Sequence, residues 1–198
     1  MNLACTIDVA LACARWTRLC PLAESLARGA AELALARGTT ALGLAWQGAV
    51  ELGITLGDAA NQQQLNRDYR GLDAPTNVLA FPVWEPGTRL PPGAPVLLGD
   101  VVLALETVAQ EAAEQKKPLA DHLVHLTVHG VLHLLGYDHL MQAEAAAMES
   151  LERLILAELG VPDPYSDPTS PVEPAAVQPC PIPGRSCARP APRAAPCS

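Results

Sequence analysis

The sequence has little positive charge. Its 198 residues include 13 Lys and Arg against 21 Asp and Glu, which gives a formal net charge of −8 with neutral histidine. Lysine is especially scarce, since only Lys116 and Lys117 occur. This balance excludes a protein that holds nucleic acid mainly through a generally basic surface, although it leaves room for a local basic cleft.

Long apolar runs and paired cysteines are also missing. The longest uncharged apolar-rich stretch, residues 122–137, contains four histidines and is shorter than the roughly 18 to 20 residues that a membrane span needs. The N-terminus has no basic segment before Asp8 interrupts its apolar residues, so we expect no signal peptide and a cytoplasmic protein without a membrane partner. The six cysteines form no C-x-x-C pair, which leaves a zinc ribbon without support and favours free thiols.

Proline divides the chain into two parts. Of the 19 prolines, 11 fall after Gly160, in residues 161–198. Proline lacks the backbone N–H and fixes φ, so this part cannot form helices or central strands. We therefore expect one domain in residues 1–160 and a Pro-rich tail, disordered or polyproline-like, in residues 161–198.

The first part alternates strand and helix patterns. Apolar alternation predicts strands at residues 3–10, 77–83 and 96–103, and a hairpin formed by residues 41–46 and 50–56. Helical periodicity predicts helices at residues 22–37 (ended by Gly38), 58–69 (capped by Asp58), 106–115, 119–135 and 142–159. Together these elements predict an α+β fold: a single domain with a mixed sheet of about four strands, packed with helices.

All five histidines lie between positions 122 and 139. His129 and His133 are four residues apart, so a helix places their Cβ atoms about 5–6 Å apart on one face. Gly136 is suited to end that helix, and the chain can then return His139 as a third ligand. Three imidazoles with one open position are typical of catalytic zinc, so we predict a metal-binding helix in the core.

The spacing of these histidines matches the long zinc motif of metzincin peptidases. Those enzymes carry a glutamate general base directly after the first histidine, where this chain has Gly130. Asp138 either orients a ligand imidazole or is a surface turn residue. His125 is interpreted as a satisfied histidine, and His122 is expected to lie outside the site.

The histidine segment also resembles the signature of the YbeY family of bacterial rRNA maturation factors. Similar agreement extends to other blocks, and the resemblance covers about residues 3–165. The matching blocks are residues 65–71 (LNRDYRG), 73–82 (DAPTNVLAFP), 98–103 (LGDVVL) and 129–139 (HGVLHLLGYDH), with Met148, Glu149 and Glu152 in the last helix.

The resemblance implies a zinc-dependent, single-strand-specific endoribonuclease that acts in 16S rRNA 3′-end maturation and ribosome quality control. It implies that His129, His133 and His139 bind one Zn²⁺ per chain and that Arg70 is the active-site arginine. The implied partners are ribosomal RNA, the small ribosomal subunit and ribosome assembly factors. Without the resemblance, Arg70 is a surface arginine that favours a helix end.

Two other functions stay open at this point. One is a metallopeptidase-like hydrolase whose base comes from elsewhere in the chain. The other is a non-catalytic ribosome assembly factor with a structural zinc.

Overall fold

A four-stranded mixed sheet is the centre of the computed structural model, which describes residues 4–138 and 141–165. Its order is β1 (Cys5–Leu11), β2 (Val50–Gly57), β4 (Val96–Ala104) and β3 (Val78–Pro82). The first three strands pair in parallel, and β3 pairs antiparallel with β4 at the edge. The predicted α+β fold with a four-stranded mixed sheet is therefore confirmed.

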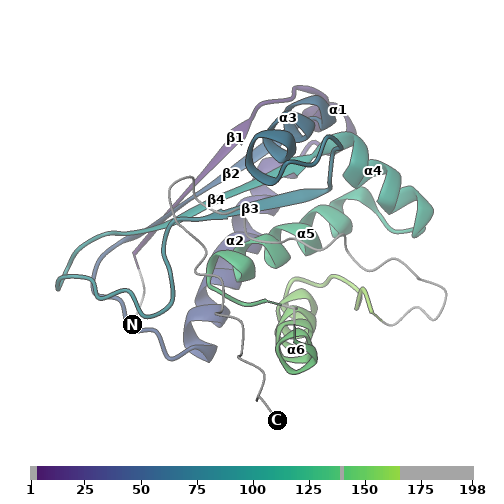
Figure 1. Ribbon diagram of the computed structural model, residues 1–198. Coiled ribbons are helices and arrows are strands. Elements are labelled where there is room, and N and C mark those ends of the chain that lie inside the picture. Colours follow the sequence, from purple (N-terminus) through teal and green to yellow (C-terminus); the bar gives the residue numbers. More distant parts are fainter. Residues whose placement is uncertain (1–3, 139–140, 166–198) are drawn as a thin grey trace, which may run out of the picture.

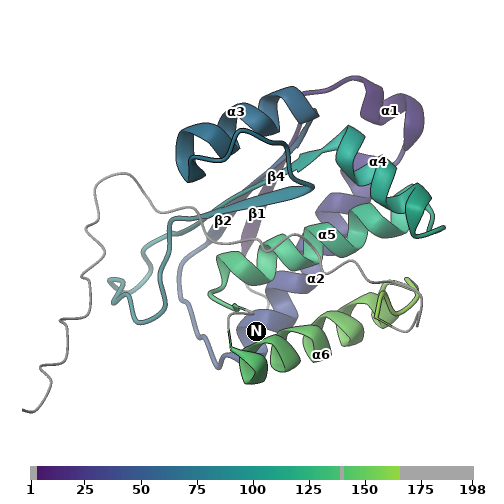
Figure 2. The ribbon, with the colours of Figure 1, turned by 45° about the vertical axis from the view of Figure 1, so that its right-hand side comes forward.

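Helices form unequal layers on the two faces of this sheet. Helices α2 (Ala23–Ala41) and α5 (Leu119–Leu134) cover one face, whereas α3 (Ala59–Arg70) lies on the other (Figure 2). Helix α6 (Gln142–Glu158) packs against α5 and α2 on the side away from the sheet (Figure 1). Helices α1 (Arg15–Leu19) and α4 (Leu105–Glu114) follow the carboxyl ends of β1 and β4.

Helix α5 is the most enclosed helix of the domain. It lies between the sheet and α6, and every residue from His122 to Leu134 is buried. The prediction that the histidine-bearing helix runs through the core is therefore confirmed. None of the described helices is both long and apolar enough to traverse a lipid bilayer.

The predicted hairpin is wrong. Residues 42–46 form no strand, and β2 follows α2 to pair in parallel with β1, so α2 is the crossover between them. Helix α2 also continues through Gly38, where a Cβ atom would lie 2.4 Å from Leu135 Cδ1. Gly38 therefore permits the close approach of α2 and α5 and does not end the helix.

Several other local predictions are confirmed. Asp58 caps α3 by accepting a hydrogen bond from the Asn61 N–H at 2.9 Å. Among the described residues, Cys5, Cys13 and Cys20 form no disulfide, and the other three cysteines lie outside this part of the chain. Of the tail predicted from residue 161, only the first five residues lie within the described part of the chain.

Candidate metal centre

Two of the three predicted ligands meet on one face of α5. His129 Nε2 and His133 Nε2 are 3.1 Å apart, and both residues are 3% exposed. Two nitrogen ligands of a tetrahedral zinc ion, each at about 2.0–2.1 Å, would lie about 3.3 Å from one another. The separation of the two nitrogens therefore fits a shared cation of this kind.

A buried carboxylate from another helix orients the first of these imidazoles. Glu152 in α6 is 0% exposed, and its Oε1 lies 2.7 Å from His129 Nδ1. A proton on Nδ1, donated to this carboxylate, leaves the lone pair of His129 on Nε2, which faces His133. Carboxylate–histidine pairs of this kind fix the tautomer and raise the basicity of metal ligands.

The charge of Glu152 follows from its surroundings. Burial alone would raise the pKa of this carboxyl group, but its interactions with His125 and His129 outweigh burial and lower the pKa well below its usual range. The group is therefore an ionised acceptor at neutral pH. The sequence holds a signal of this role, because Glu152 occupies an apolar face of α6 with Met148 and Ile155.

The other two described histidines have different partners. His122 Nε2 lies 2.8 Å from Glu111 Oε2, and the Asn77 amide donates to the same oxygen at 3.0 Å. His125 Nε2 is 3.7 Å from Glu152 Oε2, an ion-pair distance longer than a hydrogen bond. Both side chains are buried, and the structure places His122 away from the His129–His133 pair, as expected. The interpretation of His125 as a satisfied histidine is wrong for the described part of the chain, where its Nε2 has no hydrogen-bond partner.

Position 130 faces the sheet. A Cβ atom on Gly130 would lie 2.7 Å from Val101 Cγ1 and 3.4 Å from Val78 Cγ2. A glutamate here, as in metzincin peptidases, would therefore clash with β3 and β4 from its Cβ atom onward. The peptidase arrangement of base and ligand does not fit this helix.

The remaining predicted residues of the histidine motif lie at the C-terminal end of α5 and beyond it. Helix α5 ends where predicted, since Gly136 has φ 89° and its N–H donates to the His133 carbonyl at 3.0 Å. His139 lies outside the described residues, and Asp138 is half-buried just before it. Within the described ranges, no group of three His, Cys, Asp or Glu side chains suited to a metal ion occurs.

Arg70 is the last residue of α3 and is half-buried. The helix that carries it lies on the face of the sheet opposite α5 (Figure 2). The assignments of Arg70, Asp138 and His139 therefore stay predictions.

Comparisons with known proteins agree with one another. A family model described as Endoribonuclease YbeY matches residues 24–160. The chain is 52% identical over 168 residues to Endoribonuclease YbeY of Paramagnetospirillum magneticum, across 84% of this chain and 99% of that protein. It is 59% identical over 120 residues to Endoribonuclease YbeY of Parvibaculum lavamentivorans, across 58% of this chain and 65% of that protein.

Among solved structures, the chain is similar to the solution structure of TM1509 from Thermotoga maritima. The sequences are 22% identical and the TM-score is 0.47, with 83% of this chain and 99% of that chain covered.

Proposed function

This chain belongs to the endoribonuclease YbeY family, and from that premise we propose that it is a zinc-dependent, single-strand-specific endoribonuclease. We place its action in 16S rRNA 3′-end maturation and ribosome quality control in the cytoplasm. The single observation that carries the metal part of the proposal is the 3.1 Å approach of the His129 and His133 Nε2 atoms. Two imidazole nitrogens at this separation are suited to share a cation.

His129, His133 and His139 are the residues that would hold the ion. A zinc ion held by these residues would supply a Lewis acid for a phosphodiester oxygen. Glu152 keeps the His129 Nε2 lone pair in place by accepting the proton on Nδ1 at 2.7 Å. This histidine is therefore oriented before any ligand arrives.

Arg70 is proposed to act on the charge that develops during cleavage. Cleavage of a phosphodiester gathers negative charge on the phosphoryl oxygens. A guanidinium is charged at any relevant pH, and its forked donors match two of these oxygens. Electrostatic stabilisation of this kind is the role we assign to Arg70.

The net charge of −8 bears on the substrate. A protein with this charge gains little affinity from general attraction to RNA, because Lys and Arg supply that attraction. We propose that the small ribosomal subunit and associated assembly factors provide the remaining affinity. Cleavage of subunit-bound precursor should then exceed cleavage of the same RNA free in solution, and equal rates would contradict this part of the proposal.

The proposal is tested by an end-mapped cleavage assay on small-subunit precursor. His133→Ala and Arg70→Glu should both lose cleavage, while Arg70→Glu keeps its zinc and its circular dichroism spectrum. Arg18→Glu makes the same charge change at the exposed end of α1 and serves as the matched control, with cleavage retained.

Two results would overturn the proposal in favour of the alternatives. If both variants still support ribosome maturation in cells, the protein is an assembly factor whose zinc is structural. If the metal-loaded protein cuts peptides and leaves RNA intact, it is a peptidase.

A further inference from the structure

We propose that residues 161–165, here called the strap, position the metal ligand His129, and that Tyr165 is the positioning residue that acts through Glu152. The inference rests on the metal site proposed above. It adds a segment beyond α6 that belongs to neither the histidine motif nor the helix that carries it.

The contacts form a relay of three side chains. The Tyr165 hydroxyl donates to Glu152 Oε2, and the other carboxylate oxygen, Oε1, lies 2.7 Å from His129 Nδ1. A carboxylate held by one oxygen can turn about its Cγ–Cδ bond, whereas one held by both oxygens cannot. Tyr165 therefore fixes the plane of the carboxylate and with it the direction of the acceptor that His129 meets.

Tyr165 is suited to this role because it remains a donor. Burial raises the pKa of its phenol, and the neighbouring Glu152 carboxylate raises it further. Glu152 Oε2 also lies 3.7 Å from His125 Nε2. Without the hydroxyl, the carboxylate would turn toward His125, and its hydrogen bond to His129 would weaken.

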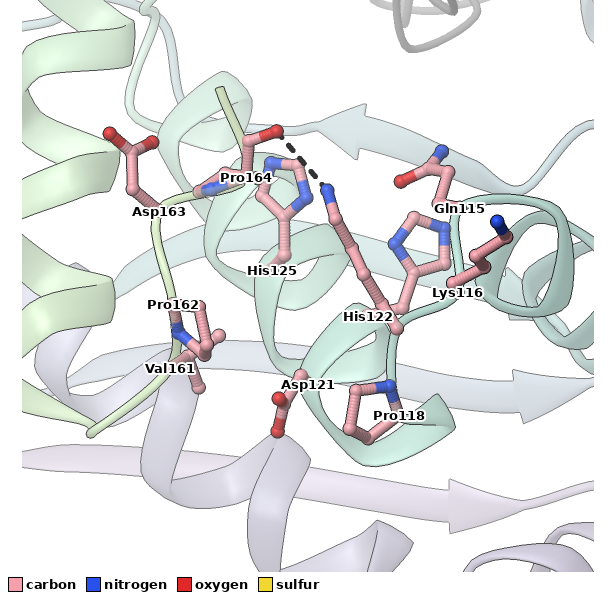
Figure 3. A pocket seen from close by; sticks show the side chains of 11 residues that line it. Gln115, Lys116, Pro118, Asp121, His122, His125, Val161, Pro162, Asp163 and Pro164 are labelled. Atoms are coloured by element: carbon pink, nitrogen blue, oxygen red, sulfur yellow. Dashed lines mark hydrogen bonds between the residues drawn. The ribbon is translucent and has the colours of Figure 1, made fainter. Parts of the chain in front are cut away.

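The strap is anchored on two sides, to the loop between α4 and α5 and to helix α6. On one side, the Lys117 ammonium donates to the Pro164 carbonyl at 3.1 Å, the contact drawn as a dashed line in Figure 3. On the other side, Arg153 in α6 lies 3.4 Å from the Asp163 carboxylate, and its guanidinium carbon is 4.7 Å from the centre of the Tyr165 ring. The Tyr165 N–H also donates to Asp163 Oδ1 at 2.9 Å.

The Tyr165 ring packs edge-on against His125 of α5, with ring centroids 5.9 Å apart, but the preceding part of the strap stands away from this helix. A cavity of about 360 Å³ separates the two, lined by His122 and His125 from the helix and by Val161 and Pro162 from the strap (Figure 3). The first residue of the strap is fixed by packing, since Val161 lies against the core and its N–H donates to the Leu156 carbonyl at 2.9 Å. Beyond it, the Lys117, Arg153 and Tyr165 contacts set the position of the strap, so a substitution at one of them should shift it.

The test is the zinc affinity of full-length Tyr165→Phe, measured by competition with a chromophoric chelator. Direct partners of metal-ligating histidines typically contribute 10–100-fold in affinity, and Tyr165 acts one step further out, so we expect a loss of roughly three- to tenfold. In ¹⁵N-histidine-labelled, zinc-loaded protein, the His129 Nδ1–H resonance should move upfield. Tyr69→Phe, an exposed tyrosine on α3, is the matched control and should change neither readout.

A second variant, Lys117→Met, removes an anchor of the strap without touching Tyr165 or Glu152. It should weaken zinc binding by roughly twofold and shift the same resonance in the same direction, and it carries the test if Tyr165→Phe does not fold. Wild-type zinc affinity with an unmoved His129 resonance in a folded variant overturns the inference, as does weakened binding with an unmoved resonance. A wild-type protein that binds no zinc at all instead refutes the proposed metal site.

Discussion

The two ends of α5 carry histidines of similar burial in different settings. Near the N-terminal end, His122 directs Nε2 at the Glu111 carboxylate, 2.8 Å away. Near the C-terminal end, His129 directs Nδ1 at the Glu152 carboxylate, and its Nε2 lies 3.1 Å from His133 Nε2. In His122 the carboxylate meets Nε2, whereas in His129 it meets Nδ1. Only the second arrangement leaves Nε2 in a position to approach the Nε2 atom of another imidazole.

Spacing along the helix does not by itself produce this convergence. His125 and His129 are four residues apart, like His129 and His133, yet their ring centroids are 6.3 Å apart against 4.6 Å for the second pair. Glu152 has one oxygen toward each ring of the wider pair. An acid from α6 therefore distinguishes two pairs that the sequence spacing makes equivalent.

Removal of one imidazole at each end gives the largest expected contrast. His133→Ala should weaken zinc binding by more than about 100-fold, above the range typical of residues that only support a ligand. His122→Ala should leave zinc affinity unchanged, because its partner is Glu111. Equal losses in the two variants, by chelator competition, would show that the two ends are not distinct.

Replacement of each histidine's carboxylate partner by an amide compares the two ends of α5 more finely. Glu152→Gln should weaken zinc binding about 10–100-fold, because the ionised acceptor of the His129 Nδ1 proton is lost. Glu111→Gln should leave zinc affinity unchanged and lower the free energy of unfolding by about 1 kcal/mol, through weaker hydrogen bonds to His122 and Asn77. Zinc titration and urea denaturation of both variants measure the two effects, and zinc affinity lost equally in both would contradict the assignment.

An effect on stability alone is expected where the C-terminal half of α5 approaches the sheet closely. Gly130→Ala should lower the free energy of unfolding by about 1–3 kcal/mol, because its Cβ atom would lie 2.7 Å from Val101 Cγ1. Gly29→Ala is the matched control in helix α2, where a Cβ atom meets nothing within 4 Å. It should raise stability by roughly 0.5–1 kcal/mol, since alanine loses less entropy in a helix than glycine. A stabilising effect of Gly130→Ala in the same urea experiment would contradict the close contact.

Local patterns predicted the C-terminal end of α5 well. The helix over residues 119–135 and its end at Gly136 follow from apolar periodicity and from the left-handed conformation that glycine tolerates. The placement of His129 and His133 on one face of the helix follows from their spacing of four. These features depend on residues close together in the sequence, so the sequence sufficed.

The failures involve distant partners. Gly38 was predicted to end a helix, but a contact with Leu135, almost a hundred residues away, explains why glycine is needed there. The hairpin prediction failed for the same reason. Strand β2 pairs in parallel with β1, and this pairing depends on the packing of the α2 crossover, which the local pattern does not show. Glu152 was noted as part of a similar block, but its hydrogen bond to His129 required the packing of α6 on α5.

The most direct test of the central claim is anomalous diffraction at the zinc edge from crystals of the full-length protein. The account predicts one peak per chain, about 2.0–2.1 Å from the Nε2 atoms of His129, His133 and His139, with one coordination position free of protein ligands. A chain without a peak between His129 and His133, or a zinc ion enclosed by four protein ligands, would contradict it.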